Sequence, residues 1–191
     1  MRAQTLVVAG PNGSGKTTFA REYVEQYPYP YISADVIAEG LSESIEEVRI
    51  EASKRFLGRI AEQIDKSESF VVESTLSGLT FKKIIHQLKK SGYEVSIVFI
   101  FLATAEACMA RIHERVRKGG HSVPESDVRR RFARSVKNFW RDYRHLVDRW
   151  HLFYNGGVQF HDVALGEGKS MEVRDEELFG LFLRIVGEEV V

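Results

Sequence analysis

The chain has 191 residues and a formal net charge of zero, because 27 Lys and Arg residues balance 27 Asp and Glu residues. This length fits one domain with a sizeable core, so we expect a single domain over residues 1–191. A neutral chain is not expected to coat nucleic acid, and its single cysteine, Cys108, excludes an intrachain disulfide. No signal peptide precedes Leu6, and the longest apolar stretch, Val95 to Ala103, is too short to span a bilayer. We therefore expect a cytoplasmic protein with neither a membrane nor nucleic acid as partner.

The first predicted element is a short buried strand from Leu6 to Ala9, which leads into the glycine-rich stretch GPNGSGKTT. This stretch matches the phosphate-loop pattern G-x-x-x-x-G-K-[ST] without a mismatch, and a helix can begin near Lys16. In such a loop, backbone N–H groups and the helix N-terminus hold phosphate, while the lysine reaches the β- and γ-phosphates. The hydroxyl of Thr17 would bind Mg²⁺. The predicted residues of this nucleoside triphosphate site are Gly10, Pro11, Asn12, Gly13, Ser14, Gly15, Lys16, Thr17 and Thr18.

Two acidic residues follow the next two predicted strands. The strand from Tyr31 to Ala34 ends at Asp35, and the strand from Phe70 to Val72 ends at Glu73, with an amphipathic helix at Glu43 to Lys66 between them. The carboxyl ends of parallel strands share one edge of a sheet, so both acids are expected near the phosphate loop. Either acid could accept the proton of an attacking hydroxyl. Asp35 could instead cap the following helix, and Glu73 could orient Mg²⁺ through water, so their roles are interchangeable here.

The rest of the chain alternates between apolar strand patterns and amphipathic helix patterns. In chain order we expect a helix at about 81–90, a strand at 94–102, a helix at about 105–116, a long helix with an apolar face from Phe132 to Leu146, a fifth strand at 152–154, a polar hairpin at 158–173 and a helix at about 175–186. This alternation favours an α/β fold with a doubly wound, mainly parallel sheet of five strands.

Positive charge is concentrated in one segment. From Arg111 to Arg149 the sequence has 12 Lys and Arg residues against 5 Asp and Glu residues, a net charge of +7. Seven arginines flank the break at Gly119-Gly120, namely Arg111, Arg115, Arg117, Arg129, Arg130, Arg131 and Arg134. A helix, a breaking loop and a second helix are typical of a lid, which we place at about residues 111–135, and its closure would cover the triphosphate and exclude water. A solvated helix face is the alternative, and His121 in the break is expected to pack or to contact substrate.

Five stretches, in order, resemble the zeta toxin family of small-molecule kinases: GPNGSGKTT at 10–18, SADVIA at 33–38, ESTLSG at 73–78, RVRKGGHSVPESDVRRRF at 115–132 and YNGG at 154–157. The resemblance implies a three-layer, P-loop kinase-like fold with an arginine-rich helical lid, and ATP with Mg²⁺ at the phosphate loop. It also implies that Asp35 is the general base and that Glu73 and Thr75 contact the substrate. The lid arginines would stabilise the transferred phosphate, with Arg115 and Arg130 ranked first, then Arg117 and Arg131.

Zeta toxins phosphorylate a sugar hydroxyl of UDP-N-acetylglucosamine, so the resemblance also implies this acceptor and an antitoxin protein as partner. We therefore expect an ATP-dependent kinase that phosphorylates a small-molecule hydroxyl. One alternative is a kinase of this fold with another acceptor, such as an antibiotic or a nucleoside. A transport-type ATPase is the second alternative, but it needs an LSGGQ-like helix start, and Leu76-Ser77-Gly78-Leu79 copies only its first three letters.

Overall fold

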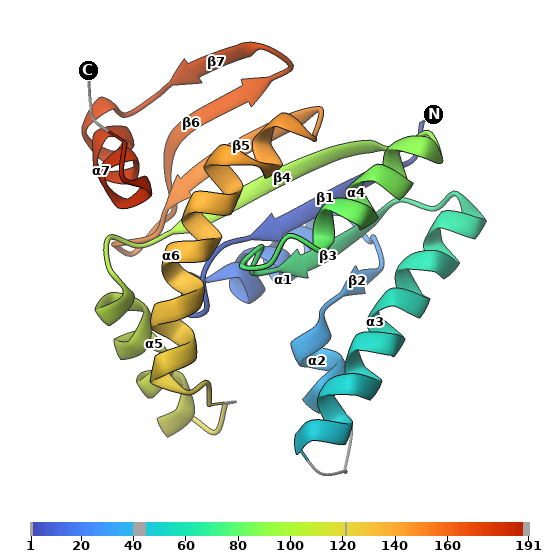
Figure 1. The fold of residues 1–191 in the computed structure, drawn as a ribbon, viewed down its shortest axis with the longest axis horizontal. Coiled ribbons are helices and arrows are strands. Elements are labelled where there is room, and N and C mark those ends of the chain that lie inside the picture. The colour runs from blue at the N-terminus through green and yellow to red at the C-terminus, as the bar shows by residue number, and fades with distance from the viewer. Residues whose placement is uncertain (1, 40–44, 121, 189–191) are drawn as a thin grey trace.

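The computed structural model describes residues 2–39, 45–120 and 122–188, and it is built around a seven-stranded sheet of order β2-β3-β1-β4-β5-β6-β7 (Figure 1). The strands are β1 (Gln4–Ala9), β2 (Tyr31–Ile32), β3 (Phe70–Ser74), β4 (Glu94–Phe101), β5 (Arg149–Tyr154), β6 (His161–Glu167) and β7 (Ser170–Val173). Strands β1 to β5 are parallel, and β6 and β7 add an antiparallel hairpin at one edge. The carboxyl ends of β1, β3, β4 and β5 therefore meet at one edge of the sheet.

Helices cover both faces of this sheet. They are α1 (Lys16–Gln26), α2 (Ala34–Glu39), α3 (Ile45–Lys66), α4 (Phe81–Lys90), α5 (Ala105–Arg117), α6 (Glu125–Arg141) and α7 (Glu176–Val186), with a 3₁₀ turn, η1, at Tyr143–His145. Side chains of β1 alternate between the layers: Val8 packs towards α1, whereas Val7 and Ala9 pack into the cluster that α3, α4, α6 and α7 cover. The result is a three-layer α/β architecture, as predicted.

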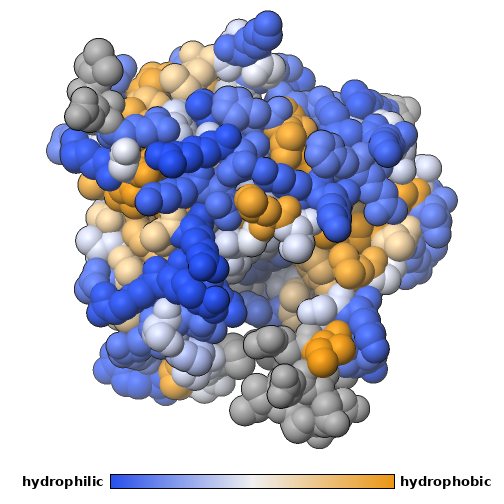
Figure 2. Space-filling view, viewed as in Figure 1, coloured by the Kyte–Doolittle hydropathy of each residue, from blue (hydrophilic) through white to orange (hydrophobic). Residues whose placement is uncertain are grey.

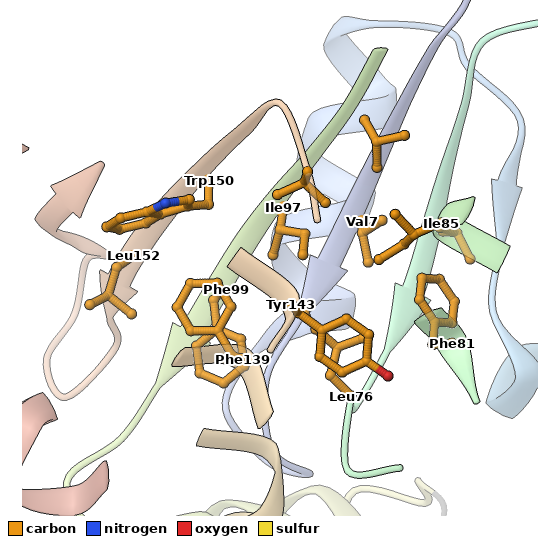
Figure 3. Packing of buried hydrophobic residues seen from close by; sticks show 14 of the residues in the cluster. Val7, Leu76, Phe81, Ile85, Ile97, Phe99, Phe139, Tyr143, Trp150 and Leu152 are labelled. Atoms are coloured by element: carbon orange, nitrogen blue, oxygen red, sulfur yellow. The ribbon is translucent and has the colours of Figure 1, made fainter. Parts of the chain in front are cut away.

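Aromatic rings join the sheet to the helices of its larger core (Figure 3). Phe99 of β4 stacks on Phe139 of α6 with ring centroids 4.2 Å apart, and Phe182 of α7 meets both rings edge-on. Such aromatic pairs add roughly 0.5–1.5 kcal/mol beyond their burial. Because these contacts hold α6 against the sheet, the position of α6 is fixed over its C-terminal half. Among the helices described, none is both long and apolar enough to cross a membrane.

Three details differ from the sequence prediction. The hairpin joins the main sheet, because β6 pairs with β5 and buries Val163 and Ala164, so the sheet has seven strands rather than five. The predicted long helix ends at Arg141, and a separate 3₁₀ turn, η1, follows it. Asp35 lies neither at a strand end nor at a helix cap, because β2 stops at Ile32 and Asp35 belongs to the first turn of α2.

Candidate active site

The phosphate loop, residues 10–15, connects β1 to α1 and is packed tightly from two sides. Gly13 has φ 83°, and a Cβ there would lie 2.5 Å from the carbonyl oxygen of Cys108 in α5. Gly15, immediately before α1, has φ 104°, and its Cβ would lie 2.4 Å from Nδ2 of Asn155, the residue after β5. Both positions therefore need glycine for their backbone angles and for space.

The N-terminus of α1 is suited to an anion. No acidic residue lies in its first turn to offset the positive end of the helix dipole, and the N–H groups of that turn have no intrahelical acceptor. Two polar atoms of the loop, Oδ1 of Asn12 and Oγ of Ser14, are buried with no hydrogen-bond partner among the described residues. The hydroxyl of Ser14 can donate to a bound phosphate group, which the positive helix end would also stabilise, whereas Oδ1 of Asn12 can only accept a hydrogen bond.

Two cavities meet at this edge of the sheet. The phosphate-loop cavity, of about 600 Å³, is lined by the loop, by α5 and by the residues after β5. The α3–α4 cavity, of about 860 Å³, is lined by α3, by α4 and by the loop between β3 and α4. Figure 2 shows the surface hollowed here, with hydrophilic side chains on the α6 side and hydrophobic ones on the α3 side. Three residues line both cavities: Lys16, Asp35 and Glu73.

Lys16 is nearly inaccessible, with 6% of its surface exposed. Its Nζ donates a hydrogen bond of 2.9 Å to the carbonyl oxygen of Pro11 and lies 3.9 Å from Oε1 of Glu73. Burial lowers the pKa of Lys16 below its ordinary value, and the negative charges of Glu73 and Asp35 oppose this effect. A triphosphate would supply further negative charge and would stabilise the protonated lysine.

Glu73 is held by neighbouring hydroxyl groups. Oγ1 of Thr17 donates to Oε2 of Glu73 at 3.1 Å, and the Tyr31 hydroxyl donates to the same oxygen. Burial, followed by the negative charge of Glu73, raises the pKa of Tyr31, so this hydroxyl keeps its proton. A threonine hydroxyl beside a carboxylate offers the oxygen ligands that Mg²⁺ prefers, with water and phosphate oxygens completing its shell.

Asp35 differs from Glu73 in its surroundings. Across the described ranges, the structure gives its carboxylate no hydrogen-bond donor, although Lys16 is close enough to interact with it electrostatically. Asp35 also lines both cavities. A carboxylate in this setting has lone pairs available to accept a proton, whereas those of Glu73 already accept two hydrogen bonds.

The predicted lid arginines occupy different places. Arg115 lines the phosphate-loop cavity, and Arg131 lines the α3–α4 cavity. Arg130 lies among the lining residues of neither cavity and donates to Oδ1 of Asp127 at 2.5 Å, with about half of its side chain exposed. Arg117 is exposed and also lines neither cavity. Thr75 lines the α3–α4 cavity, whereas His121 lies outside the described residues.

Sequence reasoning missed a small network behind the phosphate loop. Asn155 is buried, and its Nδ2 donates to the carbonyl oxygen of Ser14 at 2.8 Å. Arg111 Nη2 in turn donates to the carbonyl oxygen of Asn155 at 2.5 Å, and both residues line the phosphate-loop cavity. The YNGG stretch and the run of arginines contained these residues, but neither pattern indicated that they contact each other across 44 positions.

Comparison with known proteins gives a family. The AAA domain family profile (AAA_33) matches residues 6–137. An uncharacterized protein from Haemophilus influenzae is 30% identical over 133 residues, which cover 69% of this chain and 94% of that protein.

Solved structures share the fold at low sequence identity. A complex of AvrRxo1-ORF1 with AvrRxo1-ORF2 has a TM-score of 0.75 and 20% identity, over 97% of this chain and 64% of that chain. The PezAT toxin-antitoxin system of Streptococcus pneumoniae has a TM-score of 0.63 and 14% identity, over 100% and 80% of the two chains. Shikimate kinase from Bacteroides thetaiotaomicron has a TM-score of 0.52 and 15% identity, over 79% and 86%. These likenesses show a P-loop kinase-like α/β fold.

Proposed function

The chain belongs to the AAA domain family, and from that premise we propose that it is an ATP-dependent kinase that phosphorylates a hydroxyl group of a small molecule. The observation that carries this proposal is the meeting of two cavities at Lys16, Asp35 and Glu73. An enzyme that only hydrolysed ATP would need the phosphate-loop cavity alone. A second, larger cavity that opens onto the same lysine and carboxylates gives room for an acceptor.

The proposed chemistry assigns one task to each of these residues. Lys16 and the N-terminus of α1 would hold the phosphates, and Asp35 would take the proton from the acceptor hydroxyl as its oxygen attacks. The proton moves to a carboxylate oxygen of Asp35, and the electron pair of the broken P–O bond leaves with ADP. Thr17 and Glu73 would hold Mg²⁺, which when bound supplies neutralising charge at the phosphate oxygens.

The finer proposal is that the acceptor is the sugar of UDP-N-acetylglucosamine and that an antitoxin protein controls the activity. Its support is the set of stretches that resemble zeta toxins, together with the fold shared with the PezAT toxin-antitoxin system. The α3–α4 cavity, at about 860 Å³, is large enough for a nucleotide-sugar.

An acceptor screen tests the proposed function. The purified protein, ATP and Mg²⁺ would be incubated with UDP-N-acetylglucosamine, with nucleosides and with aminoglycoside antibiotics. The mass of each acceptor would then be measured by mass spectrometry. We expect one acceptor to gain the mass of one phosphoryl group, in a reaction that requires Mg²⁺. ATP consumption without any phosphorylated acceptor would contradict the kinase proposal.

Alanine variants of Arg115 and Arg130 test whether the basic segment stabilises the transferred phosphate or is only a solvated helix face. Because Arg115 lines the phosphate-loop cavity, Arg115→Ala is expected to lower kcat roughly 10³-fold, with a smaller effect on the Kd for ATP. Arg130→Ala should have a much smaller effect, because that guanidinium pairs with Asp127 and lines neither cavity. Steady-state kinetics of the two variants would check this. Equal losses in both would argue instead for a general electrostatic effect of the basic segment.

A further inference from the structure

The loop between β3 and α4, residues 75–80, forms one wall of the α3–α4 cavity. Five of its residues line that cavity: Thr75, Leu76, Ser77, Gly78 and Thr80. Leu76 has a left-handed backbone with φ 50°, and its side chain is 1% exposed. A leucine rarely adopts this conformation, so the surrounding structure must hold it in place.

Three side chains from α6 and the following turn η1 hold the loop. Ser135 Oγ donates to the carbonyl oxygen of Thr75 at 2.5 Å, and Asn138 Nδ2 donates to that of Leu76 at 2.9 Å. The Tyr143 hydroxyl donates to the carbonyl oxygen of Gly78 at 2.6 Å. These three residues, which lie on α6 and η1, are called the α6 clamp below. Without these three side chains, the carbonyl groups of Thr75, Leu76 and Gly78 would lose these hydrogen-bond donors.

The α6 clamp is itself firmly placed. Ser135 and Tyr143 have no exposed surface, and Figure 3 shows the Tyr143 hydroxyl pointing towards the Phe81 side of the core. Burial, followed by the charge of Asp142, raises the pKa of Tyr143 to about 12, so its hydroxyl remains a donor at neutral pH. The loop is therefore held by rigid donors rather than by mobile surface groups.

The same side of α6 also carries a cation of the cavity. Arg131, Ser135 and Asn138 follow one another at spacings of four and three residues, so they lie along one stripe of the helix. Arg131 lines the α3–α4 cavity and pairs with Asp127 at 3.3 Å. The helix thus holds one wall of the cavity and also carries the guanidinium of Arg131. The wall and this positive charge therefore keep a fixed position relative to each other.

We propose that the α6 clamp positions the acceptor: Ser135, Asn138 and Tyr143 set the shape of the α3–α4 cavity by holding residues 75–80 in register with Arg131. The inference rests on the kinase function proposed above. These are positioning residues, because they act through the loop backbone and none of them lines either cavity. Their loss should therefore affect the acceptor and leave ATP binding almost unchanged.

The experiment compares two tyrosines in similar environments. Tyr143→Phe, alone and with Ser135→Ala, removes clamp donors without creating a large cavity. Tyr93→Phe is the matched control, because Tyr93 is also buried and its hydroxyl donates to the carbonyl oxygens of Gln63 and Glu68, both at 2.8 Å. Tyr93 precedes β4, so it lies at the opposite edge of the sheet from the site. Melting temperatures would verify that all variants fold.

Two readouts are measured in each variant. The first is hydrogen exchange of the backbone amides of residues 74–80, and the second is the KM for UDP-N-acetylglucosamine and for ATP. In the double variant we expect faster exchange of this loop and an increase of about tenfold in the KM for UDP-N-acetylglucosamine, with the KM for ATP changed less than about twofold. Tyr93→Phe should lower the melting temperature without either change.

Three results would overturn the proposal: unchanged exchange of residues 74–80, a parallel rise in both KM values, or the same KM shift in Tyr93→Phe. Failure of the proposed function is distinguishable from these results. A wild-type protein that transfers nothing to UDP-N-acetylglucosamine would contradict the proposed acceptor, and the exchange measurement would then decide whether the clamp holds the loop.

Discussion

Replacing Lys16 with methionine is expected to weaken ATP binding by about 30- to 150-fold and to remove nearly all phosphoryl transfer. The change keeps the length of the side chain but deletes a charge-assisted contact to phosphate, which contributes about 2–3 kcal/mol. The effect should be near the upper end because Lys16 is 6% exposed, and water screens a buried charge poorly. Isothermal titration calorimetry with ATP would measure the Kd.

Lys118 is the comparator for this experiment. It lines the same cavity, but three quarters of its side chain is exposed and it pairs with Glu114 at 2.8 Å. Lys118→Met should therefore weaken ATP binding by no more than about threefold. Similar Kd values for wild type and Lys16→Met would show that the lysine does not hold the phosphates.

Local sequence signals predicted most of the fold. The apolar runs in β1, β3 and β4 form buried parallel strands, because strands covered on both faces require continuous hydrophobic sequence. The glycines of the phosphate loop marked positions with positive φ, which few other residues adopt. These local signals alone predicted the order of strand, phosphate loop and helix that the structure shows.

The sequence patterns did not predict contacts between residues that lie far apart in the chain. The hairpin β6–β7 was recognised as a local unit, but its pairing with β5 depends on which sheet edge is open, and local patterns carry no such information. The same holds for the bond between Asn138 and Leu76, which joins residues 62 positions apart. A serine or an asparagine within an amphipathic helix gives no sign of the carbonyl group that it will meet.

The prediction that a strand runs up to Asp35 was wrong for a local reason. The stretch YISADVIA begins with an aromatic and a β-branched residue, Tyr31 and Ile32, which favours a strand that runs up to the acid. Instead, β2 has only Tyr31 and Ile32, and the amide of Ile37 donates to the carbonyl oxygen of Ser33 at 3.1 Å, closing the first turn of α2. The carboxylate still reaches the edge of the sheet where the two cavities meet.

The surroundings of the two carboxylates favour different tasks, although the sequence left their roles interchangeable. Glu73 accepts hydrogen bonds from Thr17 and Tyr31, and its Oε1 lies 3.9 Å from Nζ of Lys16. A carboxylate engaged in this way has fewer lone pairs open to an acceptor hydroxyl, but it remains a suitable metal ligand. Glu73→Gln is therefore expected to raise the Mg²⁺ concentration needed for activity, because the metal loses a charged ligand.

Asp35→Asn is expected to lower kcat by about 10²- to 10⁴-fold, while the Kd for ATP and the melting temperature stay close to wild type. The substitution keeps the size of the side chain but removes its negative charge, and with it the ability to take a proton from the acceptor hydroxyl. If Asp35 served only the first turn of α2, its carboxylate would contribute roughly 0.3–1 kcal/mol to helix stability and nothing to the rate. Single-turnover transfer from ATP to the phosphorylated acceptor, measured from pH 5 to 9, separates the two roles. Full transfer by Asp35→Asn would exclude Asp35 as the base and would leave Glu73, with its two hydrogen bonds, as the carboxylate to test next.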